Sequence, residues 1–152
     1  MIMNENLYLY ILVRIDLPSM SVGRTAAQAS HAANAFIYKF GGKADVKEWQ
    51  KQTPQGFGTA IVLGVNVEQL KQKLSEATHR GFFTEMVVDL DYVISVSKEV
   101  MPFIDNKNLD HFEPSPTDQT KYLLHREEVT CGYIFGDKEK LVELLGDLPL
   151  YS

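Results

Sequence analysis

The chain is poor in cysteine, since Cys131 is the only one among its 152 residues. A single thiol excludes an internal disulfide framework and is typical of a reducing compartment, so we expect a cytoplasmic protein. The longest apolar runs, such as residues 60–65, are far too short to cross a bilayer. Residues 1–16 lack a basic leader and a small-residue cleavage site, so we expect a strand there rather than a signal peptide. No membrane association is expected.

The chain also has fewer basic than acidic residues. The chain has 15 Lys and Arg against 20 Asp and Glu, which gives a formal net charge of −5. This balance argues against extended, non-specific contact with DNA or RNA, although it permits a small local basic site. The four histidines show no ligand spacing and no cysteine joins them, and the stretch from Asp105, "DNKNLDHFE", lacks the glycine and the distant glutamate of a calcium loop. Phosphate-loop and dinucleotide fingerprints are missing too, so we expect no metal and no cofactor.

What is present is an alternation of apolar strands with amphipathic helices. The pattern predicts strands at residues 7–15, 59–65, 82–89 and 129–135, and helices at 23–39, around Trp49, at 67–80 and at 138–145. This order predicts an α/β fold: a three-layer sandwich in which a small mixed four-stranded sheet carries helices on both faces. The length favours a single domain over residues 1–152. Residues 97–127 exceed the usual connection of about 4–6 residues, so we expect an inserted flap, interface arm or mobile loop.

Polar residues stand where the predicted strands end. Asp16 closes the first strand, Gly23 and Arg24 open the following helix, and Asp89 closes the third strand. Ligands bind beyond the carboxyl ends of the strands in such sheets, so these positions should converge. A helix start and a guanidinium suit an anion such as a phosphate or a carboxylate. The alternative is structural, with Arg24 in an ion pair with one of the two carboxylates.

The helix predicted from residue 23 onwards is rich in alanine and carries an unusual polar set. Gln28 lies one helical turn beyond the helix start, and by itself is a surface or sheet-rim hydrogen-bonding residue. His31 on an alanine face is more often a core histidine with a satisfied hydrogen bond than a catalyst. Ser30 and His31 cannot form a nucleophile–base pair, because neighbours on a helix point about 100° apart. Cys131 is expected to be an inert core residue of a strand.

The stretch "LVRIDLPSMSVGRTAAQASHAA" resembles the archaeal/eukaryotic-type peptidyl-tRNA hydrolases. Members carry a strand that ends in Val-Arg-x-Asp-Leu, followed by Met-Gly-Lys-Gly-Lys-x-Ala-Ala-Gln-x-Ser-His-Ala. The matching residues are Arg14, Asp16, Leu17, Met20, Gly23, Ala26, Ala27, Gln28, Ser30, His31 and Ala32. The similarity continues through Trp49, residues 70–89 and residues 130–151. It therefore covers nearly the whole chain apart from the insertion.

The resemblance implies hydrolysis of the ester between a peptidyl group and the tRNA 3′ end, by a protein that is commonly a homodimer. It implies a catalytic set of Arg24, Asp89, Gln28 and Thr130 and a binding set of Asp16, Gly23, Ser30 and His31. Asp89 would orient or activate the attacking water, and Arg24 would hold a phosphate or the developing oxyanion. Gln28 and Thr130 would position these groups.

The sequence departs from the family pattern at several motif positions. The two motif lysines are Val22 and Arg24 here, and the signature Asp-Ala-Gly-Arg-Thr-Gln reads "DLDYVI" from Asp89, so that its arginine and threonine are Tyr92 and Val93. Arginine keeps the charge but cannot exchange a proton as lysine can. An electrostatic role tolerates this replacement better than proton transfer does.

These departures leave a second interpretation open, a non-catalytic tRNA- or protein-binding module on the same fold. The insertion at 97–127 carries the aromatic and apolar residues Phe103, Phe112, Tyr122 and Leu123. They predict a surface for a protein partner, or a cover over the site; alternatively they pack on their own domain.

Overall fold

The computed structural model describes residues 6–17, 19–104 and 110–152. The chain divides into two compact units, which are described separately below. Unit 1 comprises residues 1–87 and 130–152, and unit 2 comprises residues 88–129. The prediction of one domain over the whole chain stays a prediction. Two predictions fall partly outside the described residues. They concern the N-terminal stretch, of which residues 1–5 are not described, and the stretch compared with a calcium loop, of which residues 105–109 are not described.

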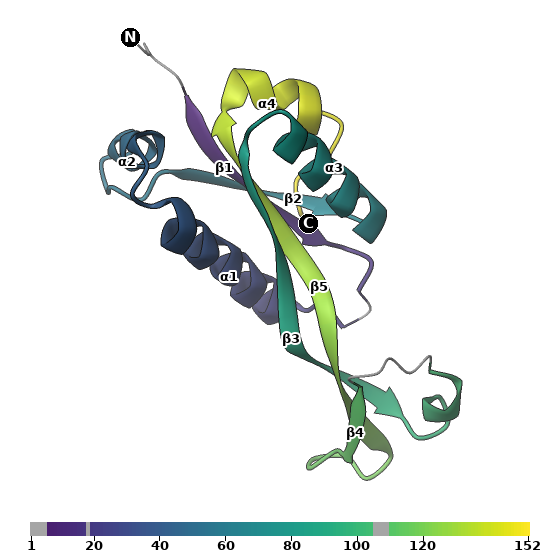
Figure 1. The fold of residues 1–152 in the computed structure, drawn as a ribbon. Coiled ribbons are helices and arrows are strands. Elements are labelled where there is room, and N and C mark those ends of the chain that lie inside the picture. Colours follow the sequence, from purple (N-terminus) through teal and green to yellow (C-terminus); the bar gives the residue numbers. More distant parts are fainter. Residues whose placement is uncertain (1–5, 18, 105–109) are drawn as a thin grey trace. The chain divides into compact units, whose positions relative to one another are not determined.

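Helices and strands alternate much as the sequence predicts (Figure 1). Along the chain they are β1 (Leu7–Arg14), α1 (Val22–Phe40), α2 (Ala44–Lys51), β2 (Thr59–Val65), α3 (Val67–His79), β3 (Phe83–Ser97), the 3₁₀ turn η1 (Met101–Phe103), β4 (His111–Pro114), β5 (Lys121–Asp137) and α4 (Lys138–Leu145). The sheet has the order β2-β1-β5-β3, and β4 pairs with β5. Because β1 is parallel to β2 and antiparallel to β5, the sheet is mixed, as predicted. It has five strands rather than four.

Helices cover both faces of the sheet in unit 1, which confirms the three-layer sandwich. On one face, α1 and α2 bury an apolar cluster that includes Leu9, Ile11, Val13, Ala32, Phe36, Trp49, Cys131, Tyr133 and Phe135. On the other face, a Cβ added to Gly132 would lie 2.7 Å from Leu74 of α3, and one added to Gly136 would lie 3.5 Å from Leu141 of α4. Figure 1 shows the same division, with α1 and α2 on one side of β1 and β5 and with α3 and α4 on the other.

The start of α1 is defined by a capping serine. Ser21 has extended backbone angles, and its hydroxyl accepts a hydrogen bond from the backbone N–H of Arg24 at 3.2 Å. Serine is among the residues preferred at this position, because its hydroxyl can accept from a free N–H of the first turn. Further along the helix Ala32 is fully buried against the sheet, because its small side chain lets the helix backbone approach closely.

The long predicted connection contains regular structure, which is the main difference from the sequence prediction. β3 continues to Ser97 and β5 begins at Lys121, well inside the segment expected to be a flap or loop. Between them, β4 pairs with β5 in an antiparallel register, with Phe112 opposite Leu124. These two strands form a local β-hairpin, with Pro114 opposite Tyr122, but the four residues of β4 are too few to give a clear strand pattern in the sequence. In the described part of the chain, no helix is long and apolar enough to cross a membrane.

Candidate functional site

Asp16 connects the end of β1 to the start of α3. Arg14 donates to it twice, from Nε to Oδ1 at 2.8 Å and from Nη2 to Oδ2 at 3.2 Å, and the backbone N–H of Val67 donates to Oδ2 at 3.2 Å. Partial burial by itself would raise the pKa of Asp16, but these donors outweigh it and hold the pKa below its ordinary value. The observed contacts give Asp16 a structural role, and the prediction that it also binds a ligand stays a prediction.

The first turn of α1 is open to solvent. Val22 and Gly23 occupy the first two helical positions, where a backbone N–H has no carbonyl partner within the helix. Val22 is 90% exposed, and a Cβ added to Gly23 would meet no atom within 4 Å. Arg24 follows in the same turn and is partly buried. The helix start is therefore exposed at Val22 and Gly23 and carries an arginine in the same turn, a combination that suits an anion.

The C-terminal segment holds this first turn in place. Tyr151 Oη and Thr25 Oγ1 are hydrogen-bonded at 2.9 Å. The same segment lies along the free edge of β2, where Gly64 N donates to Pro149 O at 3.0 Å and Tyr151 N donates to Val62 O at 3.0 Å. The start of α1 is thereby attached to the sheet through residues at the far end of the chain.

A buried hydrogen bond joins Gln28 of α1 to Thr130 of β5. Thr130 Oγ1 donates to Gln28 Oε1 at 2.7 Å, and the thiol of Cys131 donates to Gln28 O at 3.4 Å. Gln28 is 4% exposed and Thr130 is fully buried, so the interpretation of Gln28 as a surface residue is wrong. Burial raises the pKa of Cys131 to about 11, which keeps its thiol protonated and inert, as expected. The structure thus brings together two predicted site residues that lie 102 positions apart.

Ser30 and His31 lie on the exposed side of α1. Ser30 Oγ donates to Ala26 O at 2.8 Å, one turn earlier in the same helix. His31 is exposed, so the interpretation of a core histidine is wrong. A binding role for either residue stays a prediction.

Asp89 belongs to β3 in unit 2, whereas Arg24 belongs to unit 1. Its side chain is partly buried, and Asp89 Oδ1 accepts a hydrogen bond from the backbone N–H of Asp91 at 3.0 Å. One of its carboxylate oxygens is therefore oriented by its own strand. The predicted convergence of Asp89 with Arg24 and Asp16 stays a prediction.

Sequence reasoning missed a polar cluster around His125 in unit 2. The His125 ring contacts carboxylates on two other strands, Asp91 of β3 at 2.8 Å and Glu113 of β4 at 2.7 Å. The sequence separations of 34 and 12 residues leave no spacing motif to detect. Within the described residues, no group of three or more His, Cys, Asp or Glu side chains is arranged to hold a metal ion.

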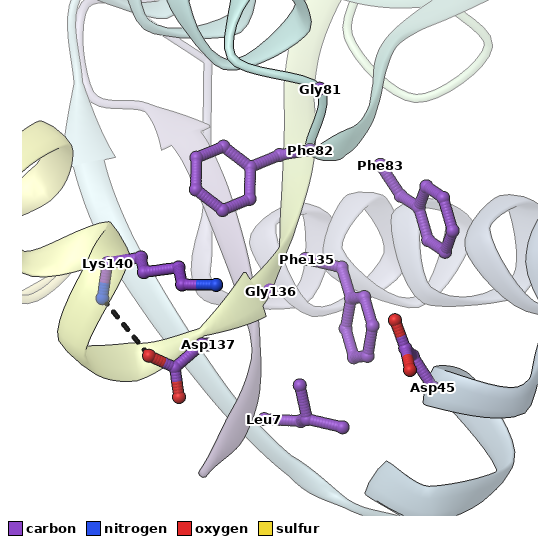
Figure 2. Close-up of a pocket in the computed structure, with 9 residues that line it drawn as sticks. All are labelled: Leu7, Asp45, Gly81, Phe82, Phe83, Phe135, Gly136, Asp137 and Lys140. Carbon is purple, nitrogen blue, oxygen red and sulfur yellow. Dashed lines mark hydrogen bonds between the residues drawn. The ribbon is translucent and has the colours of Figure 1, made fainter. Parts of the chain in front are cut away.

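A separate pocket of about 300 Å³ lies at the other end of β1, away from Asp16 (Figure 2). Its lining consists of Leu7, Asp45, Gly81, Phe82, Phe83, Phe135, Gly136, Asp137 and Lys140. The Lys140 side chain extends into the hollow, and Asp45 and Phe135 both contribute to its lining (Figure 2). None of the predicted site residues lines this pocket, so the residue pattern and this hollow identify different places on unit 1.

The comparisons with known proteins agree with the resemblance seen in the sequence. The model of the family described as peptidyl-tRNA hydrolase PTH2 matches residues 7–102, which is more than half of the chain. The chain therefore belongs to the PTH2 family of peptidyl-tRNA hydrolases. The matched segment contains Arg24, Gln28 and Asp89, and the structure attaches Thr130, outside it, to Gln28. No curated protein matches the chain significantly.

Proposed function

We propose that this protein hydrolyses the ester bond between a peptidyl group and the 3′ ribose of tRNA. The observation that carries the proposal is the family match over residues 7–102, which includes both the open first turn of α1 and Asp89. Water attacks the ester carbonyl and the ribose hydroxyl leaves, so the products are a free peptide carboxylate and a deacylated tRNA.

The proposed reaction uses one side chain as a base and another as a cation. Asp89 orients the attacking water and accepts its proton, since a carboxylate can do both. Arg24 stays protonated at every relevant pH, so its role is electrostatic: it holds a tRNA phosphate or the oxyanion that develops on the ester. The N–H groups at the start of α1 contribute to the same field.

Gln28 and Thr130 position the α1 helix that carries Arg24. Their buried hydrogen bond fixes α1 on β5 one turn beyond Arg24, and so limits the positions that the guanidinium can take. The open space at Gly23 supports an approach of the tRNA acceptor end to the helix backbone. A substrate phosphate at that place accepts the hydrogen bonds that the helix itself leaves unmade.

The test is the release of the amino acid from N-acetyl-aminoacyl-tRNA at low salt. We expect Asp89→Asn to lower the rate by a factor of about 10²–10⁴, the usual contribution of a general base. Glu127→Gln is the matched control, because it removes one negative charge from an exposed acid of unit 2 outside the proposed site. Equal release by the wild type and Asp89→Asn would show that the catalytic proposal is wrong.

The second candidate is a non-catalytic binding protein on the same scaffold. It is favoured by Phe103, which is 86% exposed in unit 2, and by the permanent charge of Arg24 where family members carry lysine. A filter-binding assay separates the two candidates. Salt-sensitive retention of tRNA without Asp89-dependent hydrolysis supports the binding protein. The proposed homodimer is tested separately by sedimentation of the purified chain.

A further inference from the structure

A continuous series of hydrogen bonds in unit 2 links Asp89 to a histidine. Asp89 Oδ1 accepts the backbone N–H of Asp91 at 3.0 Å, and Asp91 Oδ1 in turn lies 2.8 Å from His125 Nδ1. The other ring nitrogen, His125 Nε2, lies 2.7 Å from Glu113 Oε1. These residues come from β3, β5 and β4, so the contacts of one imidazole ring connect the three strands that the structure describes in unit 2.

The two contacts favour a His125 ring that carries two protons. An ionised carboxylate only accepts hydrogen bonds, and a neutral imidazole has only one N–H to donate. Carboxylate oxygens face both ring nitrogens, so the imidazolium satisfies both contacts and the neutral ring leaves one of them repulsive. The hydrogen bonds from Glu113 and Asp91 accordingly raise the pKa of His125 above its ordinary value.

The neighbouring titratable and charged groups make other contacts. The His111 ring stacks on His125 with the centroids 4.4 Å apart. The next residue on β5, Arg126, pairs with Asp110. The His125 side chain is 15% exposed, against 66% for Asp91, so the ring is the fixed member of their contact.

We propose that His125 is a positioning residue for Asp89: its doubly protonated ring fixes Asp91 on β3, and the Asp91 backbone N–H then sets the orientation of the Asp89 carboxylate. This inference rests on the proposed function, in which Asp89 is the reacting carboxylate. His125 itself touches neither the substrate nor the attacking water. It acts through one side chain and one backbone hydrogen bond.

The state of the ring determines how activity depends on pH. A raised pKa means that the contacts are complete below the ordinary histidine range and are lost as the pH rises through the raised value. Above it, the neutral ring donates to only one carboxylate and the orientation of Asp91 relaxes. We therefore expect the rate of hydrolysis to fall on the alkaline side, with kcat reduced and KM unchanged.

The first test uses NMR on the full chain and needs no activity. The ¹³C signal of the Asp89 side-chain carboxyl should show a titration step at the pKa of His125, and this step should vanish in His125→Gln and in Asp91→Asn. His111→Gln is the control, because it removes the stacked ring and leaves both carboxylate contacts of His125. An Asp89 signal that shows no such step in the wild type, or that keeps it in His125→Gln, overturns the inference.

The second test separates the inference from the proposed function on which it rests. His125→Gln should lower kcat about tenfold at neutral pH, as misplacement of a catalytic group does, and should abolish the alkaline fall. Asp89-dependent hydrolysis with an unchanged pH profile in His125→Gln contradicts the positioning role alone. Hydrolysis that does not depend on Asp89 contradicts the proposed function, while the NMR step still decides whether His125 orients Asp89.

Discussion

The two units of this protein are stabilised by different kinds of interaction. Unit 2 contains nine acidic and four basic residues, so it carries a formal charge of −5, equal to that of the whole chain, and unit 1 is formally neutral. Among the buried apolar side chains of the described residues, only Tyr92 and Leu124 belong to unit 2. Unit 1 is therefore stabilised by apolar burial, whereas unit 2 depends on polar contacts such as those of His125.

Because of this difference, we expect the two units to respond to different solution conditions. Apolar burial changes little between pH 5 and pH 9 or with moderate salt, whereas contacts between charged groups depend on both. Unit 2 also holds the proposed reacting carboxylate, Asp89, while unit 1 holds the proposed anion-binding turn at Gly23 and Arg24. Substitutions and changes of pH can thus act on the two halves of the proposed chemistry separately.

The largest effect on stability is expected from Phe36→Ala in unit 1. Phe36 is fully buried, and its ring centroid lies 4.9 Å from that of Phe135 and 5.6 Å from that of Trp49. The truncation leaves a cavity in an aromatic cluster and should lower the free energy of unfolding by about 3–5 kcal/mol. Urea denaturation measures it, with Tyr38→Ala as the control, because Tyr38 lies on the same helix and is 94% exposed. Similar losses for both variants would refute the assignment of the core.

A smaller effect is expected from Thr130→Val, which removes a polar contact inside unit 1. Valine has the shape of threonine, so the change removes the donor to Gln28 Oε1 with little change in packing. Loss of a buried hydrogen bond should reduce the free energy of unfolding by about 1–3 kcal/mol. Ser30→Ala is the control, because its hydroxyl is exposed and bonds within α1. A Thr130→Val protein as stable as the Ser30→Ala protein would contradict the structural role of the contact.

Raising the pH should loosen unit 2 and leave unit 1 intact. The pKa of His125 is raised in the folded chain, so its stabilising contacts are complete below the ordinary histidine range and disappear as the pH rises through the raised value. NMR signals from β4 should shift or broaden over that range, while signals from the Phe36 cluster stay constant. Loosening of unit 2 as the pH falls through the same range would contradict this prediction.

The smallest effect on the fold is expected from Gly23→Ala. A Cβ at this position meets no atom within 4 Å and the residue is helical, so alanine should leave stability unchanged or raise it by up to about 1 kcal/mol. Affinity for tRNA should nevertheless fall, because the methyl group occupies the space proposed for the acceptor end. Thermal unfolding and filter binding measure the two quantities. Undiminished tRNA affinity would move the binding site away from the start of α1.

The elements of unit 1 could be predicted from sequence because their signals are local. β2 and α4 have the predicted bounds, and Leu141, Leu144 and Leu145 are buried, as their spacing on one helical face predicts. Ser21 could be proposed as a cap from its residue type alone. The sequence did not predict the hairpin of β4 and β5, although the hairpin is local, because β4 has only four residues and ends in Pro114.

The features of the candidate site also differ in how far they can be predicted from the sequence. Arg24, Gln28 and Asp89 follow from the motif and its resemblance, but the burial of Gln28 depends on Thr130, 102 residues later. The exposure of His31 agrees with the sequence pattern of α1, because Ala32, Phe36 and Phe40 form the apolar stripe on the inner face and His31 lies off that stripe. The His125 contacts depend on the register of β4 and β5, and residue spacing carries no information about that register.

The rate of single-turnover hydrolysis of N-acetyl-aminoacyl-tRNA is the most direct test of the central claim, measured for the wild type, Arg24→Gln and Asp89→Asn. We predict a reduction of at least about 10²-fold for each variant, because one loses the oxyanion-stabilising cation and the other loses the base, with thermal unfolding unchanged. Wild-type rates in both variants would contradict the account.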